Sequence, residues 1–142
     1  MTWTVKLGLA ALAAGAVGLA ACATAAYTPP PGARLGDQPV DAALAAAGKR
    51  LFEKHGCYAC HAFGRTLGGP DLVGVAEGRT REWLRKWFAD TDAMIDSDPI
   101  GQALFERWKK QRMPNFRLSE RDADALIHYL ASESARVTSR SE

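Results

Sequence analysis

Five consecutive residues, Cys57-Tyr58-Ala59-Cys60-His61, are the most informative stretch of this chain. Two cysteines three positions apart lie on one side of a helical turn, so both thiols can bind the same group. The imidazole of His61 follows directly and points toward that group from the same face. One turn of backbone therefore offers two covalent attachment points and one metal ligand.

The C-x-x-C-H pattern is typical of covalent haem attachment. The thiols of Cys57 and Cys60 would add to the two haem vinyl groups as thioethers, and His61 would bind the iron. A thioredoxin-like dithiol would need a neighbouring βαβ pattern, which we do not find. A zinc site would need further ligands, and neither His55 nor His128 has suitable spacing. The motif predicts one covalently bound haem c.

The composition of the whole chain limits its class. It has 142 residues, 18 Lys+Arg against 16 Asp+Glu, and 3 cysteines. This length suits one domain and is too short for two full-sized ones. The small positive excess gives no strong nucleic-acid footprint, and three cysteines are too few for a disulfide framework. We expect a globular protein with no nucleic-acid partner.

The N-terminal segment is unlike the rest, because residues 7–33 carry no charged side chain. Residues 1–21 resemble a secretory signal peptide, with Lys6 ahead of a short apolar run. The run ends in Leu19-Ala20-Ala21-Cys22, which resembles a bacterial lipobox. Cys22 is then the predicted lipidation site, and several acyl chains on it would anchor the protein stably.

Two other interpretations of this segment stay open. An ordinary signal peptidase could cut near residues 22–26 and release a soluble protein, or residues 7–27 could remain as a membrane helix. All three interpretations place the folded part outside the cytoplasm. We expect a lipid anchor on the periplasmic side of a bacterial membrane, with residues 22–40 as a Pro-rich tether.

The folded domain is expected over residues 41–134, followed by a polar, frayed tail at 135–142. Its apolar positions recur with helical spacing, and no segment alternates with a period of two. The sequence therefore predicts an all-α fold of about four helices. Each helix has a suitable N-cap residue: Asp41, Thr80, Asp98 and Ser119. The third helix should run to about Arg112.

Over residues 41–134 the chain resembles the small bacterial monohaem class I cytochromes c. Gly48 and Phe52 correspond to the N-terminal helix of that family, and Leu126 and Tyr129 to the C-terminal helix that crosses it. The resemblance implies that Gly48 permits close approach of the two helices and that Phe52 contacts Tyr129. Ordinary amphipathic packing would bury the same residues.

The resemblance also implies two further residues at the haem. Pro70, in Gly68-Gly69-Pro70-Asp71-Leu72, corresponds to a proline whose carbonyl accepts a hydrogen bond from the proximal imidazole. Met113, followed by Pro114-Asn115, matches the distal ligand loop. His61 and Met113 are therefore the expected axial iron ligands, a pair that raises the reduction potential. A plain Gly-Pro turn and a gap-filling methionine are the alternatives.

Other methionine and histidine side chains are weaker candidates for the iron. Met94 lies in the acidic stretch at residues 90–98, which we expect to be an exposed connection without a bound metal. We expect His128 to be solvated and His55 to lie near the haem edge on the proximal side.

Several other side chains are possible neighbours of the haem. Arg65, Trp83 and Trp87 could donate hydrogen bonds to its propionates. A basic rim around the predicted distal ligand could steer an acidic redox partner, or could be a solvated helix face. The rim consists of Arg107, Lys109, Lys110, Arg112, Arg117 and Arg121.

The predicted function is single-electron transfer by a monomeric, lipid-anchored carrier that serves respiratory or periplasmic oxidoreductases as redox partners. No residue is needed as an acid, base or nucleophile, so we expect no enzymatic activity. One alternative is a haem-based sensor of small ligands, which requires that Met113 be absent from the iron. Another is an electron-entry subunit of a larger oxidoreductase complex.

Overall fold

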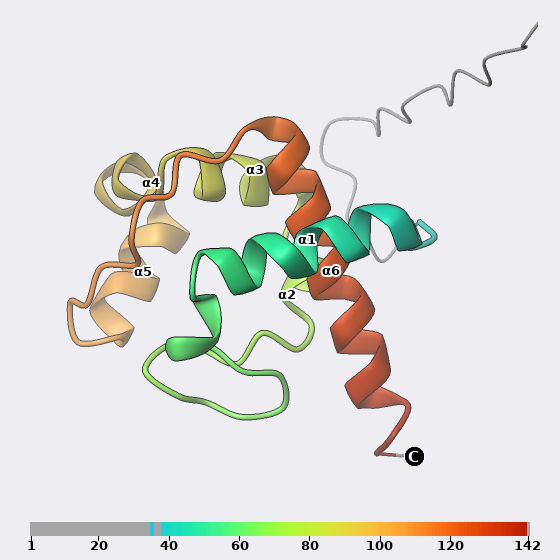
Figure 1. Ribbon diagram of the computed structural model, residues 1–142. Coiled ribbons are helices and arrows are strands. Elements are labelled where there is room, and N and C mark those ends of the chain that lie inside the picture. The colour runs from blue at the N-terminus through green and yellow to red at the C-terminus, as the bar shows by residue number, and fades with distance from the viewer. Residues whose placement is uncertain (1–34, 36–37, 142) are drawn as a thin grey trace, which may run out of the picture.

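The computed structural model describes residue 35 and residues 38–141. This part of the chain is helical and contains no strand (Figure 1), which confirms the all-α prediction. The four predicted N-caps each accept a hydrogen bond from the first turn of their helix. The elements are α1 (Ala42–Lys54), the 3-10 helix η2 (Cys57–Ala59), α2 (Val75–Gly78), α3 (Arg81–Ala89), α4 (Thr91–Ser97), α5 (Pro99–Arg107) and α6 (Glu120–Thr138).

The first and last helices cross, and this crossing organises the domain (Figure 1). A Cβ at Gly48 would lie 2.0 Å from the backbone oxygen of Ala125, so only glycine permits this approach. Beside it, the rings of Phe52 and Tyr129 pack with centroids 5.3 Å apart. Both expectations drawn from the family resemblance are confirmed.

The described residues form six α-helices where about four were predicted, and the main difference lies in the acidic stretch. Residues 91–97 form α4 instead of an exposed connection. Asp90 caps its first turn by accepting from the N–H of Ala93, and Met94 and Ile95 are buried. The stretch is therefore amphipathic, with an apolar face that supplies the burial a helix needs.

The third predicted helix ends earlier than expected, at Arg107 instead of Arg112. Lys109 and Lys110 take the left-handed backbone conformation, with φ of 56° and 61°. This conformation ends a helix and is usually reserved for glycine, which is why the sequence did not indicate it. Met113 consequently lies in an irregular segment that runs from residue 111 to residue 119.

His128 is buried, with 5% of its surface exposed, so the prediction that it is solvated was wrong. Its Nδ1 accepts a hydrogen bond from the backbone N–H of Asp41, and its Nε2 lies 3.3 Å from Arg81. Arg81 also donates to Asp124 at 2.8 Å. This buried polar group joins the start of α1 to α3 and α6, three segments distant in sequence.

The boundaries of the packed domain extend beyond the predicted range of 41–134. Leu35, assigned to the tether, is 2% exposed and belongs to the hydrophobic core. α6 continues to Thr138, into the predicted tail. The predicted signal peptide and the predicted lipidation site at Cys22 lie outside the described residues. Within the described residues no helix has the length and apolarity to cross a bilayer.

Candidate haem site

The Cys57–His61 motif forms a single tight turn directly after α1. Gly56 has φ of 66°, a left-handed conformation that turns the chain out of the helix at little cost for glycine. The N–H groups of Cys60 and His61 both donate to the carbonyl of Cys57, at 3.2 and 3.0 Å. Both cysteines are half-buried and not in a disulfide, and burial raises the pKa of the Cys57 thiol.

The ring of His61 is held in one orientation. Its Nδ1 lies 2.9 Å from the carbonyl oxygen of Pro70, and because a carbonyl only accepts, Nδ1 carries the proton. Nε2 is then left with a free lone pair, as a metal-binding imidazole requires. A Cβ at Gly69 would lie 2.6 Å from Cε1 of the ring, so Gly69 leaves the space the imidazole needs.

His61 lines a cavity of about 480 Å³, together with both cysteines of the motif. This volume lies in the range of cofactor sites, ~300–1,000 Å³. The wall is mainly apolar and includes side chains from α3, α5, α6 and the segment between α5 and α6: Leu84, Trp87, Phe88, Leu104, Phe105, Trp108, Met113, Phe116, Leu126 and Leu130. A large flat apolar cofactor fits such a wall.

The polar atoms at the cavity also fit a haem. Trp108 lines it, and its indole nitrogen is buried with no hydrogen-bond partner among the described residues. A buried donor of this kind fits a group that brings its own acceptors, as haem does with its propionates. Arg79 lines the cavity as well and could pair with a carboxylate, whereas the guanidinium of Arg112, another lining residue, pairs with Asp92 and Asp96.

Met113 is half-buried and lines the same cavity as His61. The indole nitrogen of Trp87 donates to its sulfur over 3.4 Å. Trp87 is itself stacked on Trp83, with ring centroids 5.1 Å apart and an interplanar angle of 14°. The sulfur is thus held by a side chain whose position is set by packing in α3.

The remaining predicted neighbours divide into two groups. Trp83, Trp87 and His55 all line the cavity, whereas Arg65 is exposed and does not. Met94 is buried in α4, away from the cavity. Among the described residues no group of His, Cys, Asp or Glu side chains is arranged to hold a separate metal ion.

The family model described as Cytochrome c matches residues 45–134 of this chain. The chain belongs to the cytochrome c family. A solved cytochrome c from Rhodothermus marinus is 31% identical, with a TM-score of 0.64 over 73% of this chain and 87% of that one. An engineered cytochrome c from the same organism, bound to a carbene intermediate, is 30% identical, with a TM-score of 0.60 over 69% and 83%. The comparison with curated proteins found no match.

As a small monohaem class I cytochrome c, the protein carries covalently bound haem c and acts as a haem-based electron carrier. Cys57 and Cys60 are the cysteines that fit the two thioether bonds. Sequence reasoning missed Arg79 as a cavity residue and placed Arg112 only in the basic rim. No local pattern marks which arginines reach a cavity formed by distant segments.

The basic rim is only partly available to a partner. Lys110, just past the end of α5, pairs with Glu106 in its last turn at 3.7 Å. Arg112 pairs with Asp92 and Asp96 on α4. Two of the six rim cations therefore have much of their charge balanced within the cytochrome.

Proposed function

We propose that this cytochrome c is a single-electron carrier in which His61 and Met113 are the axial ligands of the haem iron. The observation that carries the proposal is that both side chains line one apolar cavity and each is held by a hydrogen bond. Pro70 fixes the imidazole, and Trp87 fixes the sulfur. When bound, haem supplies one iron that gains or loses a single electron.

The chain's own residues favour electron transfer over ligand binding. Met113 would fill the position that a small external ligand needs, so the iron would have no open site. Apolar side chains such as Leu84 and Phe88 line the cavity and limit the entry of water, which favours the less charged ferrous form. Two ligands held by fixed groups would also keep structural change between the oxidation states small.

Carbon monoxide binding to the reduced protein tests the axial pair. The wild type is expected to bind it slowly, at a rate limited by release of Met113, whereas Met113→Ala exposes the iron and binds it promptly. Prompt binding by the wild type would contradict the carrier proposal and favour the sensor.

We further propose that the carrier works on the periplasmic side of a membrane, anchored through Cys22. The lipobox-like sequence before this cysteine supports the anchor, and the Pro-rich residues 22–34 support a semi-rigid tether. A tether keeps the domain close to membrane-bound redox partners and raises its effective concentration there. Cys22→Ser is expected to move the cytochrome from the membrane fraction to the soluble periplasmic fraction. An unchanged membrane fraction would contradict lipidation.

A further inference from the structure

The segment that carries Met113 has no backbone support of its own. In the described chain, residues 112–117 make no backbone–backbone hydrogen bond, and the next such bond is from the N–H of Leu118 to the carbonyl of Phe88, at 3.0 Å. An irregular segment of this kind has many conformations open to it. Side-chain contacts must therefore fix where Met113 lies.

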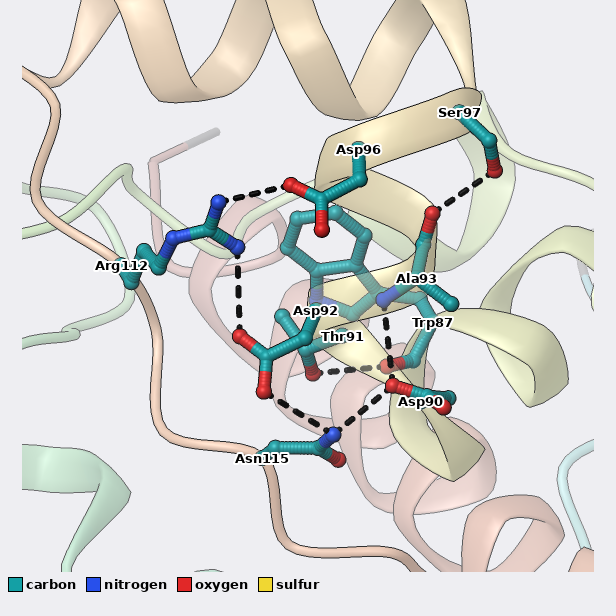
Figure 2. Close-up of polar contacts among 9 residues, drawn as sticks. All are labelled: Trp87, Asp90, Thr91, Asp92, Ala93, Asp96, Ser97, Arg112 and Asn115. Atoms are coloured by element: carbon teal, nitrogen blue, oxygen red, sulfur yellow. Dashed lines mark hydrogen bonds and ion pairs between the residues drawn. The ribbon is translucent and has the colours of Figure 1, made fainter.

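Those contacts come from α4 and its N-cap Asp90, and they bind Arg112 and Asn115 (Figure 2). These two residues lie before and after Met113 in the sequence. On one side, Arg112 donates to Asp92 at 3.2 Å and to Asp96 at 2.6 Å. On the other side, Asn115 donates to Asp90 at 2.8 Å and to Asp92 at 3.3 Å. Asp92 thus contacts both flanking residues, one with each carboxylate oxygen.

We propose that the acidic face of α4 positions Met113 as the axial ligand by holding the residues on either side of it. This inference rests on the proposed function, since it concerns the iron ligand assigned there. Asp92, Asp96 and Arg112 are positioning residues, because they act through Met113 and would not touch the iron themselves. We call this set of contacts, with Asn115 and Asp90, the α4 clamp.

α4 is a firm support because its opposite face is buried. Thr91 is 1% exposed and Ile95 is 4% exposed. The hydroxyl of Thr91 donates to the carbonyl of Trp87 at 2.8 Å, which ties α4 to the tryptophan that donates to the Met113 sulfur (Figure 2). α5 packs closely on α4, since a Cβ at Gly101 would lie 2.2 Å from the carbonyl oxygen of Met94.

Arg112 is also held from the cavity side. Its guanidinium lies 5.1 Å from the ring centroid of Phe105, which lines the cavity. The residue before Met113 is therefore fixed between α4 and α5. The guanidinium thus contacts the ring of Phe105 and pairs with Asp92 and Asp96 at the same time.

The strength of the clamp is limited by exposure. The side chains of Arg112, Asp92 and Asp96 are 43%, 51% and 63% exposed. Exposed ion pairs contribute ~0.2–1 kcal/mol each and are screened by salt. The clamp therefore favours the conformation in which Met113 can bind the iron by a modest, salt-sensitive free energy. The salt dependence can be used to test it.

The test compares Asp92→Asn/Asp96→Asn with the wild type and with Glu106→Gln. Both carboxylates are exposed and cap no helix, so the double variant is expected to fold, which thermal unfolding checks. Glu106→Gln is the matched control, because it removes an exposed ion pair of the same rim that does not flank Met113. The single variant Asp96→Glu keeps both carboxylate charges and is expected to behave as the wild type.

The readout is binding of imidazole to the ferric protein, which requires Met113 to leave the iron. Apparent affinity rises in proportion to the fraction of open segments. Losing both ion pairs is expected to tighten imidazole binding about threefold to tenfold, and the far-red methionine–iron band should weaken. Added salt should tighten imidazole binding to the wild type and to Glu106→Gln, but much less to the double variant.

Unchanged imidazole affinity and an unchanged salt response in the double variant would overturn the clamp. A wild type that binds haem but lacks the methionine band would instead overturn the ligand assignment. Limited proteolysis within residues 111–117 separates the two failures, since cleavage reports opening of the segment without reading the absorption of the iron. Faster cleavage in the double variant supports the holding of the segment by α4, and equal cleavage overturns it.

Discussion

The indole N–H of Trp87 lies 3.4 Å from the sulfur of Met113 and donates to it. A hydrogen bond to a ligand sulfur withdraws electron density from the iron and favours the ferrous form. Trp87→Phe removes the donor and keeps an aromatic ring. We expect the reduction potential to fall by about 20 mV, equivalent to ~0.5 kcal/mol for one electron. Redox titration measures it.

Trp83→Phe is the matched control for Trp87→Phe. Trp83 stacks on Trp87, but its own indole nitrogen donates to Asp98 at 3.0 Å, away from the sulfur. This variant should keep the wild-type potential more closely than Trp87→Phe does. Equal shifts in both variants would show that packing, and not the hydrogen bond, sets the potential.

Between elements, Gly48 of α1 lies close against the backbone of α6. Gly48→Ala places a Cβ 2.0 Å from the carbonyl oxygen of Ala125, a backbone atom that cannot move without moving the helix. Overpacking typically costs ~1–3 kcal/mol, and a clash with the backbone places this variant at the upper end of that range. We expect a large drop in thermal stability of the holoprotein, measured by circular dichroism.

Gly78→Ala serves as the control for that variant. Gly78 ends α2, and a Cβ there would meet nothing within 4 Å. Its stability should stay within ~0.5 kcal/mol of the wild type. If Gly48→Ala were equally harmless, the close crossing of α1 and α6 would be contradicted.

The buried His128 predicts a pH dependence for the packing of α1, α3 and α6. Burial, followed by the charge of Arg81, lowers the pKa of His128, while Asp41 and Asp124 oppose this shift. An exposed histidine titrates near ~6.5, so the unfolded chain takes up the proton first as pH falls. The contribution of His128 is complete above ~6.5 and is lost as pH falls through its folded pKa.

Thermal unfolding of the holoprotein between pH 7 and pH 5 measures this effect. The wild type should lose stability over that interval more steeply than His128→Gln, which has no titrating ring. The variant is expected to be less stable at pH 7, because it loses the bond from the N–H of Asp41. Parallel pH profiles would show that His128 does not titrate on unfolding.

The molecule as a whole is built around its cofactor. Without haem, the apolar wall of this cavity of about 480 Å³ would face water, which removes part of the hydrophobic burial that stabilises the fold. A small domain is stable by only ~5–15 kcal/mol, so such a loss is large beside it. Cys57→Ala/Cys60→Ala, which removes both thioether sites, is therefore expected to unfold at far lower temperature or to lack a cooperative transition. A transition close to that of the holoprotein would contradict this account.

Much of the site could be predicted because it is local. The turn from Cys57 to His61 and the bond from His61 to Pro70 lie within fourteen residues, and their spacing is typical of one family. The burial of His128 and the role of Arg112 depend on segments far apart in sequence. α4 was missed because the four aspartates of residues 90–98 resemble a loop. Asp90 and Asp98 are helix caps, and Asp90, Asp92 and Asp96 are partners of Arg112 and Asn115.

Ligation of the iron by Met113 is tested most directly by the far-red absorption of the ferric protein, expressed with haem-maturation machinery. We expect a weak methionine–iron band in the wild type that disappears in Met113→Ala while the haem content is unchanged. Met94→Leu should keep the band, because Met94 does not line the cavity. A wild type with bound haem and no such band, or a band that survives in Met113→Ala, would contradict ligation by Met113.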